Sequence, residues 1–232
     1  MLEAHDLAAG FDGRTLFDGV TFALESGRIM GLCGASGAGK TTLGRVIAGL
    51  HRPSAGVVRI DGQQPASGKA QPVQYLHQSP LAAMNPRWKI RCILAEAGQP
   101  EAGLLTAFGV DAEWMGRFPH ELSGGQLQRI SILRALTANP RYLIADEITA
   151  PLDPVSQARI WHLLGQIARS KQIGILAISH DRALLDRICC QGRFELGQRG
   201  LIRHEAAGPV GVIDPDPAGR SARSAGRTAV RC

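Results

Sequence analysis

The sequence lacks the features that mark membrane-spanning, secreted and zinc-binding proteins. No stretch approaches the roughly 18 consecutive apolar residues of a membrane-spanning helix. The opening residues, MLEAHDLAAGFDG, have neither the charged nor the apolar region of a signal peptide. The five cysteines include no CxxC pair, which argues against a disulfide framework and against a zinc site. These absences predict a cytoplasmic protein whose core needs no disulfide bonds.

The 232 residues are enough for one globular domain with its own core. At this length a chain buries roughly 70% of its unfolded surface. The net charge of +6 would suit an anionic partner, but +2 of it lies in residues 206–232. That stretch is rich in Gly, Pro, Ser, Ala and Arg, and it predicts a disordered basic tail. We therefore predict no specific binding of nucleic acid.

Short apolar runs alternate with helical patterns along the chain. The runs predict strands over 19–24, 28–33, 56–60, 73–76, 142–145 and 173–178. The helical patterns cover 40–50, 124–138, 154–170 and a segment from about 181. Between them, 79–120 mixes proline, glycine and short helical pieces, so that about 79–138 is predicted to be an inserted helical subdomain. Continuous apolar strands that alternate with helices indicate an α/β fold with a parallel sheet covered on both faces.

One glycine-rich segment matches the phosphate-binding pattern GxxxxGK[ST] and lies between an apolar strand and a helix. Its glycines allow successive backbone N–H groups to turn toward phosphates at the positive end of a helix. Lys40 is expected to reach the β- and γ-phosphates and the Thr41 hydroxyl to coordinate Mg²⁺. The alternative is a turn that only joins strand and helix. The predicted ATP-binding residues of this loop are Gly34, Ala35, Ser36, Gly37, Ala38, Gly39, Lys40, Thr41 and Thr42.

Two adjacent carboxylates, Asp146 and Glu147, follow the apolar run Tyr-Leu-Ile-Ala. They lie at the carboxyl end of a predicted buried strand, where ligands of α/β sheets bind. Beside a phosphate loop, Asp146 is expected to hold Mg²⁺ and Glu147 to polarise the attacking water. The alternative is an acidic helix start that only complements the helix dipole.

The segment Leu-Ser-Gly-Gly-Gln closely resembles the signature of ATP-binding cassette (ABC) proteins, and its members here are Ser123, Gly124, Gly125 and Gln126. Its serine and glycine N–H groups would form a second anion site at a helix start. The resemblance implies that two cassettes pair head to tail and that each signature acts on the ATP of the other. It also implies a P-loop NTPase fold over about 1–205, with a RecA-like parallel core, an antiparallel β subdomain and the helical subdomain.

Four further positions match the ABC pattern. Phe11 is placed where the family stacks an aromatic ring on adenine, although a lone Phe could equally be core. Gln78 matches the glutamine loop that touches Mg²⁺ and faces the membrane partner. Asp153 matches the loop that crosses the dimer interface, and His180 matches the histidine that contacts the γ-phosphate. The sequence departs from the family at Pro151 and in a helical subdomain that looks short for an importer.

Within the family, two segments resemble the ATPases of nickel, dipeptide and oligopeptide importers. One is 78–87, which contains Asn-Pro-Arg, and the other is 118–129. The implied function is ATP hydrolysis that powers import of metal chelates or of di- and oligopeptides. Its partners would be a second cassette (identical or different), membrane permease subunits and a solute-binding protein, with the chain peripheral on the inner face of the membrane. The alternative is an ABC ATPase of a soluble complex, such as one for phosphonate degradation. A DNA-associated ATPase is disfavoured because there is no heptad array.

Overall fold

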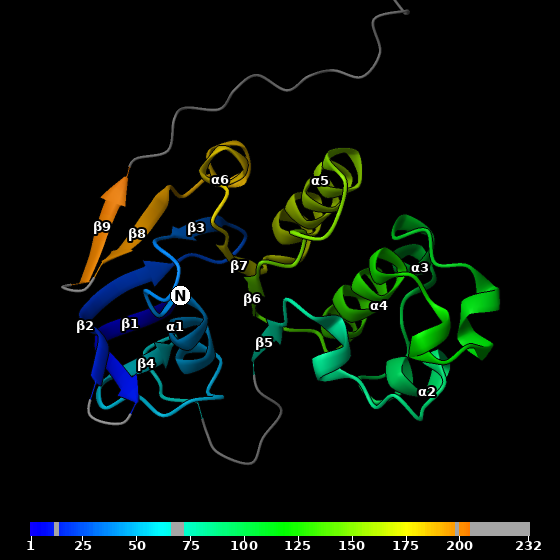
Figure 1. Cartoon of the computed structure of the whole chain (residues 1–232), viewed down its shortest axis with the longest axis horizontal. Helices are drawn as coiled ribbons and strands as arrows, with labels where there is room; N and C mark the ends of the chain where they lie inside the picture. The colour runs from blue at the N-terminus through cyan, green and yellow to red at the C-terminus, as the bar shows by residue number, and fades with distance from the viewer. Residues whose placement is uncertain (12–13, 66–71, 198–199, 205–232) are drawn as a thin grey trace, which may run out of the picture.

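The computed structural model describes residues 1–11, 14–65, 72–197 and 200–204 (Figure 1). The basic tail predicted over 206–232 lies outside these residues. The described part contains two sheets, and helices pack on and beside the larger one. None of the described helices is both long and apolar enough to cross a membrane.

The larger sheet has six strands in the order β5-β6-β7-β3-β8-β9. All neighbours are parallel except β8 and β9, which are antiparallel. Every residue of β3, β6 and β7 is buried, which is the expected pattern for central strands covered on both faces. The strand bounds are β3 Ile29–Cys33, β5 Val73–Leu76, β6 Tyr142–Asp146, β7 Gly174–Ile178, β8 Arg193–Gly197 and β9 Gly200–His204.

A second, antiparallel sheet has the order β2-β1-β4. Its strands are β1 (Leu2–Phe11), β2 (Arg14–Leu24) and β4 (Ala55–Ile60). The strand predicted over 19–24 is therefore only the end of β2, and β1 was not predicted at all. Register shifts interrupt the pairing of β1 with β2, so that three consecutive residues in the middle of β1 are buried and the alternation of period two is broken.

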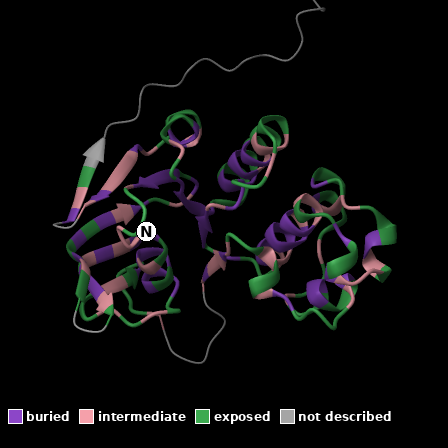
Figure 2. Cartoon of the chain, viewed as in Figure 1, coloured by how far each residue is buried: buried purple, intermediate pink, exposed green. Residues whose placement is uncertain are grey.

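The two faces of the larger sheet carry two separate cores (Figure 2). Alternate residues of each central strand contribute to opposite faces: Ile144 faces the core that contains α1 (Lys40–Ile47), and Leu143 faces the other. Helices α5 (Pro154–Lys171) and α6 (Arg182–Ile188) cover this second face. Helix α1 ends three residues earlier than predicted, where Gly49 takes a φ of 71°.

The segment predicted to be a helical insertion consists of short helices around one longer one. The longer helix is α4 (Gly124–Thr137), and the others are α2 (Ile90–Ala95), α3 (Ala102–Ala107) and the 3₁₀ turns η1 (Pro80–Ala83), η2 (Ala112–Gly116) and η3 (Pro119–Glu121). They lie together beside the β5 edge of the larger sheet (Figure 1). Buried side chains such as Ile93, Phe108 and Trp114 give this group a continuous core with α4 and α5.

Gly174, at the start of β7, permits a close approach between neighbouring strands. A Cβ added there would lie 2.6 Å from the Tyr142 ring and 2.8 Å from the Glu25 carbonyl oxygen. We expect Gly174→Ala to lower the free energy of unfolding by about 1–3 kcal/mol because the buried ring must move. Urea denaturation would measure the loss. The control is Gly103→Ala in α3, where a Cβ meets nothing within 4 Å; equal midpoints for wild type and Gly174→Ala would contradict the argument.

Candidate functional site

The glycine-rich loop connects β3 to α1 and wraps around the side chain of Lys40. The Lys40 ammonium donates to the carbonyl oxygens of Gly34 and Ala35, each at 2.9 Å. Although it is charged, Lys40 is only 9% exposed. A buried ammonium held by its own loop is close to any anion that the loop binds.

The backbone of this loop has the conformation that an anion cradle needs. Gly37 and Gly39 have φ values of 78° and 97°, a region that side chains disfavour. No side chain caps α1, whose N-cap is Gly39 itself. Among the described residues, the first N–H groups of the helix therefore have no side-chain cap, and they lie at its positive end, as a phosphate site requires. The residues Ala35, Ser36, Ala38 and Thr42 complete the loop and the first turn.

Asp146 ends β6 beside this loop and is 4% exposed. Two hydroxyl groups donate to its Oδ2: Thr41 at 2.9 Å and Tyr75 at 2.5 Å. Thr41 and Asp146 supply the hard oxygen atoms that Mg²⁺ prefers. Among the described residues no three or more His, Cys, Asp or Glu gather as a metal cluster. The donors therefore fit a cation that binds few protein groups and shares its coordination with phosphates.

Glu147 has a contact on each of its two carboxylate oxygens. His180 Nδ1 lies 3.2 Å from Oε1, and Gln78 Nε2 donates to Oε2 at 3.3 Å. The three residues come from the ends of β6, β7 and β5, which are neighbours in the sheet. Glu147 has a φ of 50°, which is unusual for a non-glycine residue. This backbone is fixed by the Glu147 N–H, which donates to the Ile178 carbonyl at 3.0 Å.

The signature segment forms the start of α4. Ser123 Oγ accepts from the Gln126 N–H at 3.3 Å, and Gln126 Oε1 accepts from the Ser123 N–H at 2.8 Å. After this reciprocal cap, the first two helical positions are occupied by Gly124 and Gly125, which have no side chains of their own. Within the described ranges no hydrogen bond or ion pair joins this segment to the glycine-rich loop. In the described part of one chain, the signature segment and the glycine-rich loop thus make no polar contact with each other.

Asp153 caps α5 by accepting from the N–H groups of Val155 and Ser156 at 3.0 and 2.9 Å. The hydrogen bond with the Ser156 side chain is the main reason that the pKa of Asp153 is lowered. The loop before it is fixed by Thr149 Oγ1, which accepts from Trp161 Nε1 at 3.0 Å. No sequence motif points to Thr149.

Phe11 ends β1 and is 50% exposed, so it does not belong to the core. Its ring lies 4.9 Å from that of His51, tilted by 46°. An exposed aromatic face of this kind is free to stack on a planar ligand.

The family model described as ABC transporter matches residues 17–150, which is more than half of the chain. The chain belongs to the ABC transporter family.

Two curated relatives of this ABC chain are from Bacillus subtilis (strain 168). It is 37% identical over 213 residues to the putative oligopeptide transport ATP-binding protein YkfD, a match that covers 81% of this chain and 65% of YkfD. It is 35% identical over 191 residues to the oligopeptide transport ATP-binding protein AppF, covering 74% of this chain and 58% of AppF. The chain therefore spans less than two thirds of the length of these relatives.

Solved structures confirm the predicted ABC cassette fold. A structure described as the ATP-binding subunit of an ABC transporter has a TM-score of 0.78 at 26% identity, over 88% of this chain and 90% of that one. The dimeric cassette MJ0796, in a post-hydrolysis state bound to ADP and Pi, has a TM-score of 0.77 at 20% identity. That match covers 90% of this chain and 100% of MJ0796 and concerns the fold alone.

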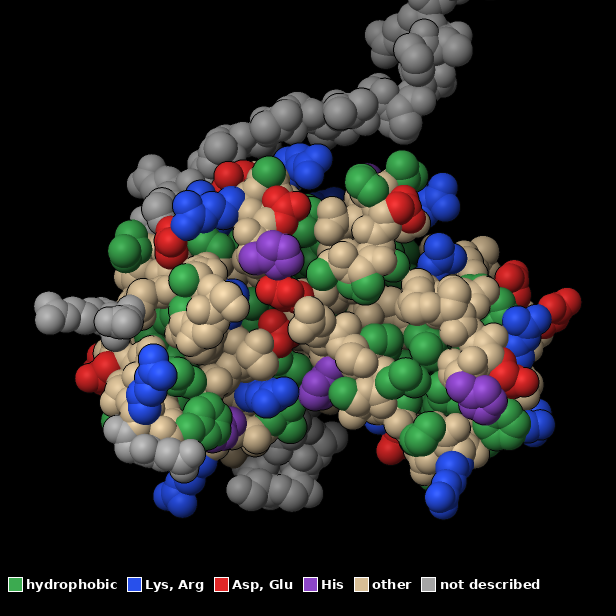
Figure 3. All heavy atoms as spheres, viewed as in Figure 1, with side chains coloured by type: hydrophobic (Ala, Val, Ile, Leu, Met, Phe, Trp, Pro, Cys, Tyr) green, Lys and Arg blue, Asp and Glu red, His purple; other side chains and the backbone are tan. Residues whose placement is uncertain are grey.

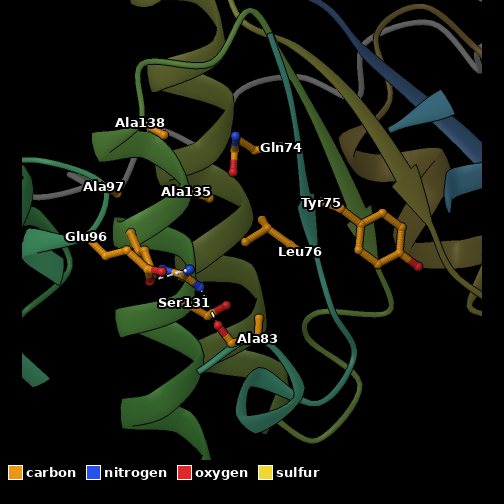
Figure 4. A pocket seen from close by; sticks show the side chains of 10 residues that line it. Gln74, Tyr75, Leu76, Ala83, Glu96, Ala97, Ser131, Ala135 and Ala138 are labelled. Atoms are coloured by element: carbon orange, nitrogen blue, oxygen red, sulfur yellow. Dashed lines mark hydrogen bonds and ion pairs between the residues drawn. The ribbon is translucent and has the colours of Figure 1, made fainter. Parts of the chain in front are cut away.

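A pocket of about 240 Å³ lies in this ABC chain between β5 and α4 (Figure 4). Gln74 and Leu76 project from β5 toward it, whereas Tyr75 projects to the other side of the strand. The wall opposite β5 is tied together by Arg134, which donates to the Ala83 carbonyl and to Glu96 at 2.7 Å. Because β5 runs directly into Gln78, the pocket and the glutamine of the site are parts of one continuous segment.

Charge is distributed unevenly over the face drawn in Figure 3. Acidic side chains and a histidine lie next to one another near its middle, whereas Lys and Arg side chains are spread apart.

Proposed function

We propose that the chain is the ATP-hydrolysing subunit of an ABC importer, with the ATP-binding domain over residues 1–205 and the helical subdomain inserted at about 79–138. One observation carries the proposal. Glu147, whose carboxylate contacts Gln78 and His180, directly follows Asp146 in the sequence, and Asp146 is hydrogen-bonded to Thr41 beside the phosphate loop. Di- or oligopeptides are the favoured solute because YkfD and AppF are described as oligopeptide transport proteins. The descriptions of these two relatives do not mention nickel, the other solute that the sequence resemblance suggested.

The proposed reaction is in-line attack of water on the γ-phosphate of ATP, which forms a new O–P bond as the bond to the β–γ bridging oxygen breaks and ADP leaves. Glu147 orients the water and accepts its hydrogen bond, and His180 and Lys40 donate to the γ-phosphate oxygens. Mg²⁺, held by Thr41, Asp146 and Gln78, would neutralise charge that develops on the phosphates. Phe11 would stack on the adenine.

The signature requires a second cassette in this proposal. Ser123, Gly124, Gly125 and Gln126 form an anion site that is separate from the phosphate loop of their own chain. A second cassette placed head to tail would bring each signature onto the γ-phosphate held by the other chain. Asp153, on the loop beside the signature, would then lie at the interface.

We also propose that the pocket beside β5 and the adjoining surface contact the permease. Leu81 in η1 and Trp88 after it are large apolar side chains that remain 48% and 42% exposed there. Through this contact the chain would be peripheral on the inner face of the membrane, with a solute-binding protein in the same system.

The deciding experiment is purification of the tagged chain from detergent-solubilised native cells, with mass spectrometry of what accompanies it. We expect integral-membrane subunits, with a second cassette if the dimer is mixed. Trp88→Ala should reduce permease recovery roughly tenfold if this side chain anchors the contact, whereas Leu50→Ala, another exposed apolar position, should not. Recovery of soluble metabolic subunits alone would overturn the importer proposal in favour of the soluble complex.

A further inference from the structure

Among the described side chains that donate a hydrogen bond to Asp146, Tyr75 is the one that no motif accounts for. It lies on β5, three residues before Gln78, and pairs in the sheet with Ile144. Ile144 and Asp146 are two residues apart on one strand, so they face the same side of the sheet. A tyrosine beside Ile144 therefore has the reach to bring its hydroxyl to Asp146, and the Tyr75 oxygen lies 2.5 Å from Asp146 Oδ2.

The structure makes room for this ring. Gly44 of α1 packs directly over it, and a Cβ at Gly44 would lie 3.2 Å from Tyr75 Cε2 and 2.9 Å from Ile178 Cδ1. The ring thus lies between α1 and the sheet, and its hydroxyl is directed toward Asp146. The Tyr75 phenol donates its hydrogen bond to the carboxylate oxygen.

The two oxygens of Asp146 are used differently. Oδ2 accepts from both Tyr75 and Thr41. Oδ1 receives no hydrogen bond from the described residues. It is also not one of the described side-chain atoms that are both fully buried and without a hydrogen-bond partner. We propose that Tyr75 is a positioning residue that holds Oδ2 and thereby turns Oδ1 toward the cation that accompanies ATP. The inference rests on the proposed function, because it concerns how the cassette prepares its cation site.

The chain offers a matched control, since it contains only two tyrosines. Tyr142 is fully buried on β6, on the same face as Asp146, but its hydroxyl lies 3.2 Å from Ser26 Oγ at the far end of the strand. Tyr75→Phe and Tyr142→Phe each remove one partly buried hydroxyl and keep the ring. They differ in whether that hydroxyl reaches Asp146.

The test compares wild type, Tyr75→Phe and Tyr142→Phe with a fluorescent ATP analogue, first in EDTA and then in a Mg²⁺ titration. We expect Tyr75→Phe to bind the nucleotide in EDTA within about twofold of wild type but to need about tenfold more Mg²⁺ for the Mg²⁺-dependent signal and for half-maximal hydrolysis. Tyr142→Phe should match the wild type in all three measurements. An unchanged Mg²⁺ requirement in Tyr75→Phe, with or without a lower melting temperature, would overturn the inference.

A second measurement does not depend on a folded variant. Wild-type protein labelled with 3-fluorotyrosine should give two ¹⁹F resonances, and adding Mg²⁺ to the nucleotide-bound protein should shift one of them. Shifting neither resonance would contradict the inference. If the wild type binds Mg²⁺ and nucleotide in this way but never hydrolyses ATP, the proposed function fails while the role of Tyr75 stands.

Discussion

Glu147→Gln is expected to lower steady-state ATP hydrolysis by at least about a hundredfold while leaving ATP binding unchanged. The amide has the shape of the carboxylate, so the neighbouring contacts with Gln78 and His180 can persist. It lacks the negative charge that polarises the attacking water, and loss of such a group typically costs about 10²–10⁴ in rate. Phosphate release and the affinity for a fluorescent nucleotide would measure the two effects separately.

The same variant should accumulate as a dimer in Mg²⁺ and ATP. If the signature of one cassette closes on the ATP of the other, a chain that binds ATP without hydrolysing it remains closed. Size-exclusion chromatography with light scattering would show the dimer. The control is Glu113→Gln, because Glu113 is an exposed partner of Arg117 in the helical segment and distant in sequence from the site. Hydrolysis by Glu147→Gln at the wild-type rate would contradict the role assigned to this carboxylate.

The sequence was sufficient to predict the strands and loops that carry the glycine-rich loop, Gln78, Glu147 and His180 in the candidate site. The glycine-rich loop follows the fully buried strand β3, and the Asp146-Glu147 pair lies at the end of the fully buried strand β6. Such strands appear in the sequence as continuous apolar runs. The parallel order of the sheet then brings Gln78, Glu147 and His180 to one edge. Residues that lie 69 and 33 positions from Glu147 thus contact it through topology alone.

The features that the sequence did not predict depend on the register between strands, on irregular strand pairing and on partial burial. Tyr75 reaches Asp146 only because β5 pairs with β6 in the register that sets Tyr75 beside Ile144, and no periodicity encodes that choice. Strand β1 was missed because its register shifts disrupt the alternation that would have revealed it. Strand β8 was missed because most of its residues are only partly buried, so its sequence carries no continuous apolar run.

Lys40→Met is expected to weaken ATP binding about a hundredfold. In the described structure the ammonium donates to Gly34 and Ala35, and on binding it would exchange these carbonyl partners for phosphate oxygens. A hydrogen bond to a charged group contributes about 1.5–3 kcal/mol, so the loss of two amounts to at least about 3 kcal/mol, and this lower limit corresponds to the hundredfold change. Methionine keeps most of the volume of the buried side chain. Titration with a fluorescent ATP analogue would measure the affinity.

Two comparisons separate this effect from a general loss of fold or charge. Lys171→Met removes an ammonium that pairs with Glu101 at the surface, and it should leave the affinity unchanged. The double variant Lys40→Met/Glu147→Gln should fail to form the ATP-dependent dimer at nucleotide concentrations that saturate Glu147→Gln, because in the proposed dimer the second signature contacts the γ-phosphate. A dimer that persisted in the double variant would mean that the two chains associate without nucleotide. Bound ATP would then not be what brings the two cassettes together.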